Sequence, residues 1–535
     1  MPKKDHLYEL IQTMDKSEKR YFKIYFANEK KEQKYLKLYD ALEKTKVYDE
    51  KKIKHQINDA YIQKHFAETK YYLYQLILKV LKHYRTENSV DNLLLEKIQN
   101  IEVLIQKALW EQADSELSKA KKMAYDYERF EFLILLFSYQ NKIIVSTRLH
   151  GYSAGDLDKF WSEKSLAFQN FSDTQTARHK VMQLLESKNR IGYIKTKQDR
   201  DFYDNLKKDI ETILKKADCT IARIYAIESL VFYFNHTGEK KQQNLYCKKL
   251  VELHAKNPAI NASNPYQLPS AIHNLCLSEI NLYNFDEALR WIKIQQTYLQ
   301  IIGNDAEIKY KVEWSLASLQ SYYYNVSGKF GEGIYSAGNI IKWLETTEEI
   351  DHTSKWKFYG NCAEIYLGAK DYKNFFYCMR KLQEFWNNID TYNKINYTLL
   401  QMLAHIDEKD TDAALYSYNF LEKEINTIRK DNPTATERIL LSFFKKLQDR
   451  KQPKSRNVLL KETWQELKEN EREIQTGEFE YALWLEQMLT KSSYENLVRQ
   501  KRTLQSEDFT AFRNDEVKIL IDIESFRKSL PKRIR

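Results

Sequence analysis

Glycine and proline are scarce in this chain of 535 residues, which contains 12 glycines and 7 prolines. Average usage would supply several-fold more of both. β-Sandwiches, barrels and doubly wound sheets of this length need many tight turns, and those turns depend on glycine and proline. Their scarcity therefore argues against a sheet protein and favours long helices joined by short connections.

Motifs for catalysis and for metal binding are also missing. The one cluster of glycines, Gly328, Gly331 and Gly333, follows no predicted strand and lacks the Lys-Ser/Thr ending of a phosphate-binding loop. No His-Glu-x-x-His pair and no Gly-x-Ser-x-Gly elbow occurs. His273 and Cys276 could share a helix face, but nothing nearby completes a tetrahedral zinc site. We therefore expect no enzyme activity, no metal and no cofactor.

Cysteine pairs and long apolar runs are the third absence. The start of the chain has no apolar core of a secretory signal. The most apolar window, 130–137, contains Glu131 and is too short to cross a bilayer. The cysteines include no Cys-x-x-Cys pair and are expected to be reduced and buried: Cys219, Cys247, Cys276, Cys362 and Cys378. We expect a cytoplasmic protein without a membrane partner.

Apolar and charged residues are plentiful instead. Hydrophobic residues make up 43% of the chain and aromatic residues 13%, which is enough to fill a core. Charged residues make up 30% and alternate in sign at spacings typical of exposed helix faces. The net charge of +10 leaves a polyanionic partner open as an alternative.

Residues 1–90 predict a separate helical head that is basic and rich in tyrosine. Leu7, Leu10, Ile11 and Met14 recur at helical spacing, and the segment 67–84 has enough apolar surface for a buried helix. Between residues 51 and 90, eight basic residues stand against three acidic ones.

Residues 91–450 predict a repeat array in which an apolar helix, a short polar turn and a second helix alternate. The clearest copies are 275–299 and 361–385. The segment 258–270, with three prolines, gives the strongest prediction of a loop. We expect the second helix to cross the first at a marker residue that recurs every 39 to 48 residues: Ala113, Trp161, Tyr203, Gln243, Ala288, Gly333, Phe375 and Ala414.

Over residues 95–425 this pattern resembles divergent tetratricopeptide repeats. The breaker after the second helix survives at Asn257-Pro258 and at 431–433, while the tryptophan and Leu-Gly of the family signature are mostly absent. The resemblance implies an all-α fold, an α-solenoid of stacked antiparallel helix pairs that follows the N-terminal head. A basic, tyrosine-rich head joined to such repeats is also similar to uncharacterised proteins of Bacteroidota. Residues 451–535 predict further C-terminal helices and a basic tail, 526–535.

The resemblance also implies a binding surface, because the first helix of each pair lines the concave side of such arrays. Asparagines near the ends of first helices could bond the backbone of a ligand, or they could satisfy the following turn. The candidate partner-binding residues on this face are Tyr225, Glu228, Asn235, His273, Asn281, Tyr322, Asn325 and Glu364.

Three functions are compatible with these observations. The first is a non-catalytic scaffold or adaptor that holds a protein or peptide, in which substitution of Tyr322 or Asn325 weakens binding without lowering stability. The second is a nucleic-acid-associated factor whose basic head (51–85) and tail (527–535) contact phosphates. The third, an enzyme, would need a pocket with perturbed acid–base groups, for which the sequence offers no candidates. The scaffold is the prediction and the nucleic-acid factor is its alternative.

Overall fold

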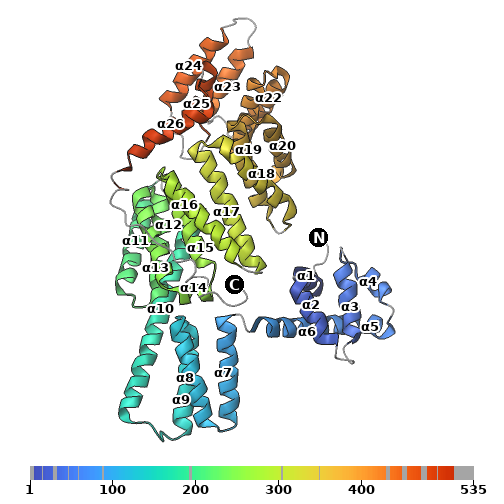
Figure 1. Ribbon diagram of the computed structural model, residues 1–535, viewed down its shortest axis with the longest axis vertical. Coiled ribbons are helices and arrows are strands. Elements are labelled where there is room, and N and C mark those ends of the chain that lie inside the picture. The colour runs from blue at the N-terminus through green and yellow to red at the C-terminus, as the bar shows by residue number, and fades with distance from the viewer. Residues whose placement is uncertain are drawn as a thin grey trace. The chain divides into compact units, whose positions relative to one another are not determined.

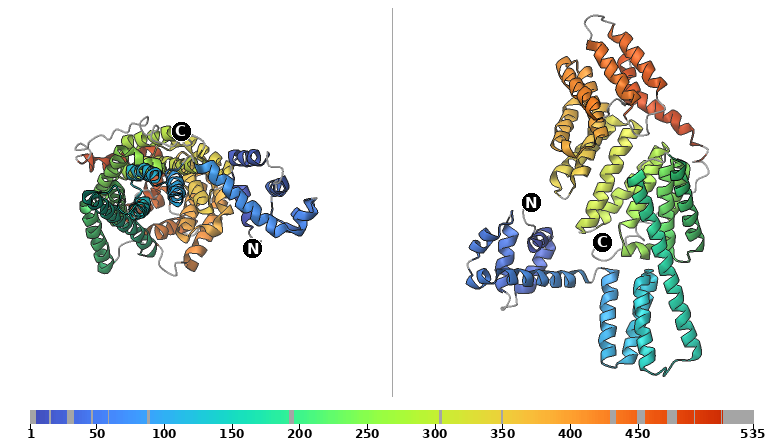
Figure 2. Two further views of the ribbon diagram at one scale, coloured as in Figure 1. Left: turned by 90° about the horizontal axis from the view of Figure 1, so that it is seen from below. Right: turned by 180° about the vertical axis from the view of Figure 1, so that it is seen from behind.

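The structure is a computed structural model, and it describes the chain in fourteen stretches. They are residues 5–14, 16–27, 33–45, 47–57, 59–86, 89–191, 196–302, 305–348, 350–428, 434–448, 455–470, 479–490, 492–510 and 512. The regular structure of these residues is helical, with no strand among them. The expected all-α fold is confirmed, and consecutive helices pack on one another as in an α-solenoid (Figures 1 and 2).

The chain divides into two compact units between Phe171 and Ser172. The helices of the first unit and the helix at the division are α1 (His6–Thr13), α2 (Lys16–Ala27), α3 (Gln33–Lys44), α4 (Glu50–Gln56), α5 (Ala60–Lys64), α6 (Phe66–Thr86), α7 (Val90–Gln106), α8 (Trp110–Asp126), α9 (Phe130–Ser146) and α10 (Ala154–Ile191).

Helices α1 to α6 of the predicted head enclose a core of their own. Phe22, Leu38, Tyr39, Leu42 and Ile77 are fully buried in it. Aspartates cap three of these helices, since their side chains accept hydrogen bonds from backbone amides in the first turns of α1, α4 and α5.

The second unit continues with helix pairs and one short 3-10 helix. Its elements are α11 (Lys197–Lys216), α12 (Thr220–Thr237), α13 (Lys240–Lys256), α14 (Pro258–Ser263), α15 (Gln267–Asn281), α16 (Phe285–Ile301), α17 (Ala306–Ser327), α18 (Phe330–Thr346), α19 (His352–Gly368), α20 (Tyr372–Glu384), η2 (Trp386–Asn388), α21 (Thr391–Asp407), α22 (Thr411–Ile428), α23 (Ala435–Gln448), α24 (Arg456–Glu469), α25 (Tyr481–Leu489) and α26 (Tyr494–Glu507).

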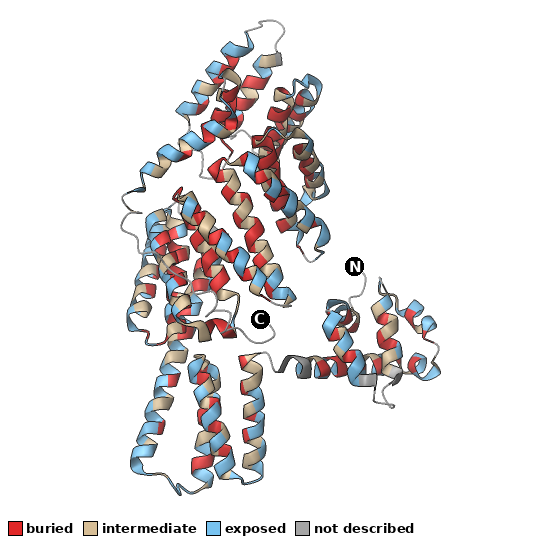
Figure 3. Cartoon of the chain, viewed as in Figure 1, coloured by how far each residue is buried: buried red, intermediate tan, exposed pale blue. Residues whose placement is uncertain are grey.

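Most marker residues lie at one position of a helix pair. In α8, α13, α16, α18, α20 and α22 the marker is the fourth residue of the second helix, and it is buried. A small side chain suits this place, because a Cβ added to Gly333 would lie 3.0 Å from both Ile365 and Tyr324. Figure 3 shows the same arrangement, with buried positions on the faces where paired helices meet.

Two expectations about the array are wrong. Trp161 marks no helix crossing, because it lies within α10, a single helix of 38 residues, and is 57% exposed. No proline interrupts the segment from 154 to 191, so nothing stops the helix. The loop expected at 258–270 is largely helical, since α14 begins with Pro258 and α15 begins at Gln267. Proline is compatible with the first position of a helix, where its missing amide hydrogen has no partner to lose.

The connections within pairs share one turn geometry. A residue in the left-handed region, with φ between 55° and 75°, follows the first helix at Gly238, Tyr283, Gly328, Lys370 and Lys409. Only two of these five residues are glycines, although glycine adopts this conformation without steric cost. Three of these five turns therefore form without a glycine that would have marked them in the sequence.

The last helices return to the middle of the array. Helices α24 to α26 share one hydrophobic core with α17 to α23. In α26, Arg502 Nε donates to the carbonyl oxygen of Val326 at 3.0 Å, and its Nη2 donates to Glu480 Oε1 at 2.7 Å. A Cβ added to Gly328 would lie 2.7 Å from Cγ1 of Val498, so only glycine fits beneath α26. The predicted boundary at 450/451 and the predicted tail 526–535 lie outside the described residues.

Candidate functional site

A cleft in the second unit collects polar side chains from four helices. It lies between α10, α12, α13 and α15 and has a volume of about 310 Å³. The side chains that give it its chemical character are Arg178, Tyr225, Glu228, His254, Tyr266 and Asn274. Two of these, Tyr225 and Glu228, belong to the predicted partner-binding face.

Packing on both sides of α12 sets the direction of Glu228. Ala226, Leu230 and Tyr233 pack into a core with Leu184 of α10 and Tyr203 of α11. Three other residues of α12, Ile224, Ile227 and Val231, pack into the core that includes α13 and α15. Residues three apart share a helix face, so Tyr225 and Glu228 lie together on the strip that these two cores leave free.

Burial dominates the electrostatics of Glu228. It raises the pKa of the carboxyl group from 4.5 to about 7, because the charged form loses hydration. Among the residues that the structure describes, no hydrogen bond or ion pair joins this carboxyl group to a partner. Glu228 is half-buried, so its unpaired carboxyl group remains open to a ligand that enters the cleft.

The other ionisable groups of the cleft are engaged or neutral near pH 7. His254 Nδ1 donates to Asn261 Oδ1 at 2.8 Å, and Asn261 Nδ2 donates back to the carbonyl oxygen of His254. Burial lowers the pKa of His254 to about 4, which leaves the ring uncharged. The guanidinium carbon of Arg178 lies 6.0 Å from the centre of the Tyr225 ring. Arg178 thus brings a guanidinium group to the cleft, and Glu228 brings a carboxyl group.

The edge of the cleft on α10 is apolar and exposed. Met182 and Leu185 line it with 56% and 43% of their surface exposed, while their neighbours Val181 and Leu184 are buried. Sequence analysis missed both edge residues. A signal was present, because the segment 181–185 carries apolar residues on two faces of one helix, more than one core requires.

The other predicted site residues lie outside the cleft, and four of them join neighbouring first helices. His273 Nδ1 lies 2.8 Å from Ser315 Oγ, and the Tyr322 hydroxyl donates to Asn281 Oδ1 at 2.8 Å, so both pairs connect α15 with α17. Asn325 Nδ2 donates to the carbonyl oxygen of Asn361 at 3.1 Å and connects α17 with α19.

The remaining two predicted residues do not line the cleft. Asn235 is exposed near the end of α12, and Glu364 is half-buried on α19. Of the eight predicted residues, the structure therefore brings only Tyr225 and Glu228 together in a cleft.

Replacing Tyr322 with phenylalanine is expected to lower the free energy of unfolding by about 1 kcal/mol, because the bond to Asn281 is lost between two packed helices. Urea titration of the full chain measures this loss. In a double-mutant cycle with Asn281→Ala, the two losses should not add. Unchanged stability would instead support the prediction that Tyr322 contributes to partner binding alone.

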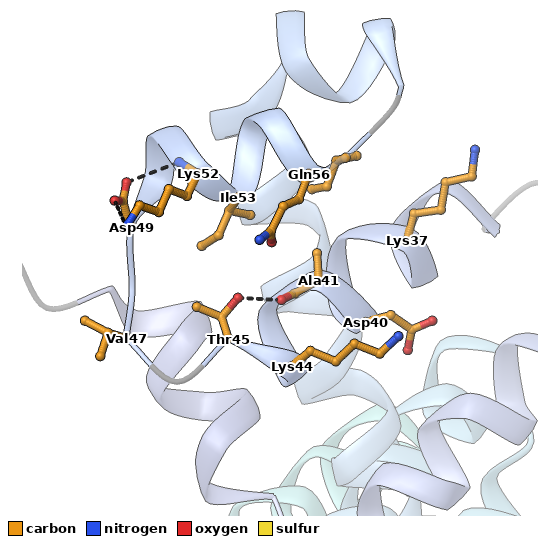
Figure 4. A pocket seen from close by; sticks show the side chains of 11 residues that line it. Lys37, Asp40, Ala41, Lys44, Thr45, Val47, Asp49, Lys52, Ile53 and Gln56 are labelled. Atoms are coloured by element: carbon orange, nitrogen blue, oxygen red, sulfur yellow. Dashed lines mark hydrogen bonds and ion pairs between the residues drawn. The ribbon is translucent and has the colours of Figure 1, made fainter.

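A second pocket, of about 740 Å³, lies in the head between α3 and α4 (Figure 4). Several of its polar groups have partners within the head. Thr45 Oγ1 donates to the carbonyl oxygen of Ala41 at 2.7 Å, and Asp49 Oδ1 accepts from the backbone amides of Lys51 and Lys52. These contacts stabilise the first turn of α4 and the end of α3.

Several lysines of the basic head form ion pairs within it. Lys70 pairs with Asp5, Lys54 Nζ lies 2.8 Å from Glu50 Oε1, and Lys37 Nζ lies 3.3 Å from Asp59 Oδ2. The side chain of Arg85 and the basic tail lie outside the described residues. The described head thus gives the nucleic-acid hypothesis no additional support, and that hypothesis stays a prediction.

Two absences and one comparison complete the description of the site. Over the described stretches, no group of three or more His, Cys, Asp or Glu side chains is arranged to hold a metal ion. Within the same stretches, no helix has both the length and the apolar character of a membrane span. Neither a protein-family model nor a curated protein matches this sequence.

Proposed function

We propose that this protein is a non-catalytic scaffold that binds an extended segment of a partner protein in the cleft between α10, α12, α13 and α15. The observation that carries the proposal is the carboxyl group of Glu228, which has no partner in the described chain and lies beside the exposed side chains of Met182 and Leu185. An unpaired polar group next to exposed apolar surface is typical of a surface that a ligand completes.

Binding accounts for this cleft better than catalysis does. Many hydrolytic mechanisms use two groups, either an acid with a base or a nucleophile with its base. Glu228 is the one carboxyl group among the described residues of the cleft, and His254 is engaged with Asn261. We include a cytoplasmic location in the proposal, because all five cysteines are buried free thiols.

Selection of peptides from a displayed random library, with the full chain as bait, tests the proposal. The scaffold is expected to enrich peptides whose binding weakens at least tenfold in the Met182→Asp variant, since a charge at the edge of the cleft repels apolar contacts. Val458→Asp serves as the matched control, because Val458 is 47% exposed on α24 and lies outside the cleft. Failure to enrich any peptide that distinguishes Met182→Asp from Val458→Asp would contradict the proposal.

A further inference from the structure

We infer that the bound segment carries a lysine or arginine whose cation pairs with Glu228, with an apolar neighbour that packs on Met182 and Leu185. This inference rests on the proposed function and specifies the chemistry of the partner at the same cleft. It concerns a protein segment, because the apolar edge extends the contact surface beyond the place that a single cation occupies.

The carboxyl group of Glu228 favours a ligand group that carries a positive charge and donates hydrogen bonds. The Glu228 carboxyl group has lost part of its hydration through burial and accepts no hydrogen bond from a described residue. An ammonium or guanidinium group replaces that lost hydration with charge-assisted hydrogen bonds, which are about twice as strong as neutral ones. A second carboxylate at this place would instead add repulsion between like charges.

The size and the polar walls of the cleft fit one long side chain. Its volume of about 310 Å³ is at the lower end of the range for ligand sites, too small for a folded element. Gln267, Ser270 and Asn274 on α15 line the wall and supply oxygen acceptors for the remaining hydrogens of a cation. Lysine and arginine combine such a head with an apolar stem that suits the walls formed by Ile224 and Leu250.

Arg178 restricts the neighbours of the basic residue. Its guanidinium lies over the Tyr225 ring on the same cleft and repels a second cation. It also offers donors to a backbone carbonyl or an acidic side chain of the segment. We therefore expect a single basic residue flanked by apolar or acidic residues, and not a run of basic ones.

The pairing also makes binding depend on pH. Only the ionised form of Glu228 attracts a cation, and the pKa of about 7 leaves that form scarce at pH 6. The other ionisable groups that line the cleft are Arg178, Tyr225, His254 and Tyr266. Burial lowers the pKa of His254 to about 4 and raises the pKa of Tyr266 above 10, so neither of these two groups changes its charge between pH 6 and pH 8. Linkage then predicts binding about tenfold weaker at pH 6 than at pH 8.

Four peptide pools test the inference on the full chain. Each pool consists of acetylated nonapeptides with a fixed central residue, which is lysine, arginine, glutamine or norleucine, and with mixed residues elsewhere. The lysine and arginine pools are expected to bind at pH 8 at least tenfold more tightly than the glutamine and norleucine pools. This preference should disappear in Glu228→Gln and should weaken at pH 6. Spermidine, a free polyamine, should not displace the bound peptides at equal concentration.

The outcomes separate this inference from the proposed function. If the norleucine pool binds as well as the lysine pool, and Met182→Asp abolishes binding while Glu228→Gln does not, the scaffold stands and the inference is overturned. Displacement by spermidine at equal concentration would overturn it in favour of a small-amine site. If no pool binds at either pH, both the inference and the proposed function are overturned. Loss of folding does not confuse the result, since Glu228→Gln removes a buried charge and keeps the shape of the side chain.

Discussion

Replacing Gly368 with alanine is expected to lower the free energy of unfolding by about 3 kcal/mol. Gly368 is the last residue of α19, and a Cβ added to it would lie 2.4 Å from Cγ of Phe330. The Phe330 ring is 3% exposed and stacks on Tyr494 with 5.3 Å between ring centres, so it has no space to move. Urea titration of the full chain, followed by tryptophan fluorescence, measures the loss.

Gly338 provides the matched control, because it is an exposed glycine in the interior of α18. The nearest atom to a Cβ added there is the Tyr366 hydroxyl oxygen, at 3.8 Å, which is an ordinary contact. Gly338→Ala is therefore expected to raise the free energy of unfolding by up to about 1 kcal/mol, the difference in helix propensity. Equal stability of the two variants would contradict the packing of α18 against α19 described above.

Replacing Glu228 with glutamine is expected to stabilise the protein at pH 8 by up to about 3 kcal/mol and to change little at pH 4. The carboxyl group titrates near 4.5 in the unfolded chain and near 7 in the folded one. The folded state thus binds the proton more tightly, and the stability present below pH 4.5 is lost as the pH rises to about 7. The difference between the two pKa values corresponds to about 3 kcal/mol. Glutamine is neutral at every pH, so the variant does not lose this stability as the pH rises.

Unfolding by urea at pH 4, 6 and 8 measures this effect in the wild type and in the variant. Glu466→Gln is the matched control, because Glu466 is exposed on α24 and its substitution should change stability by less than about 0.5 kcal/mol at each pH. A wild type and a Glu228→Gln variant with the same dependence on pH would show that the carboxyl group is solvated or paired in solution. A residue that lowers stability at neutral pH is typical of a functional site.

The helix pairs could be predicted from the sequence because their signals are local. A buried small or aromatic residue recurs at the fourth position of the second helix, for example Ala288 and Phe375. The prediction at Trp161 was wrong because it relied on the spacing between markers alone. A single uninterrupted helix, α10, fits that spacing as well as a helix pair does. The return of α26 could not be predicted, because Arg502 and Val326 lie 176 residues apart and no local pattern links them.

The candidate site was only partly predictable. Tyr225 and Glu228 share a face of one helix, and this periodicity was visible in the sequence. Arg178 and His254 reach the cleft from other helices, so only the tertiary arrangement brings them together. Tyr322 and Asn325 bond neighbouring first helices and do not line the cleft. Polar residues that bind a ligand and polar residues that bond the next helix recur at the same spacing, so the sequence alone does not distinguish them.

The return of α26 onto the turn after α17 has a consequence for protein synthesis. In an ideal repeat array each unit contacts only its neighbours, and folding can follow the growing chain from one unit to the next. Here Phe330 is covered by Tyr494, and Val326 is bonded to Arg502, which leaves the ribosome 176 residues later. During synthesis, the surface around Phe330 therefore stays uncovered until α26 emerges from the ribosome. Aggregation and chaperone binding during synthesis are therefore expected to concentrate at the α17–α18 turn.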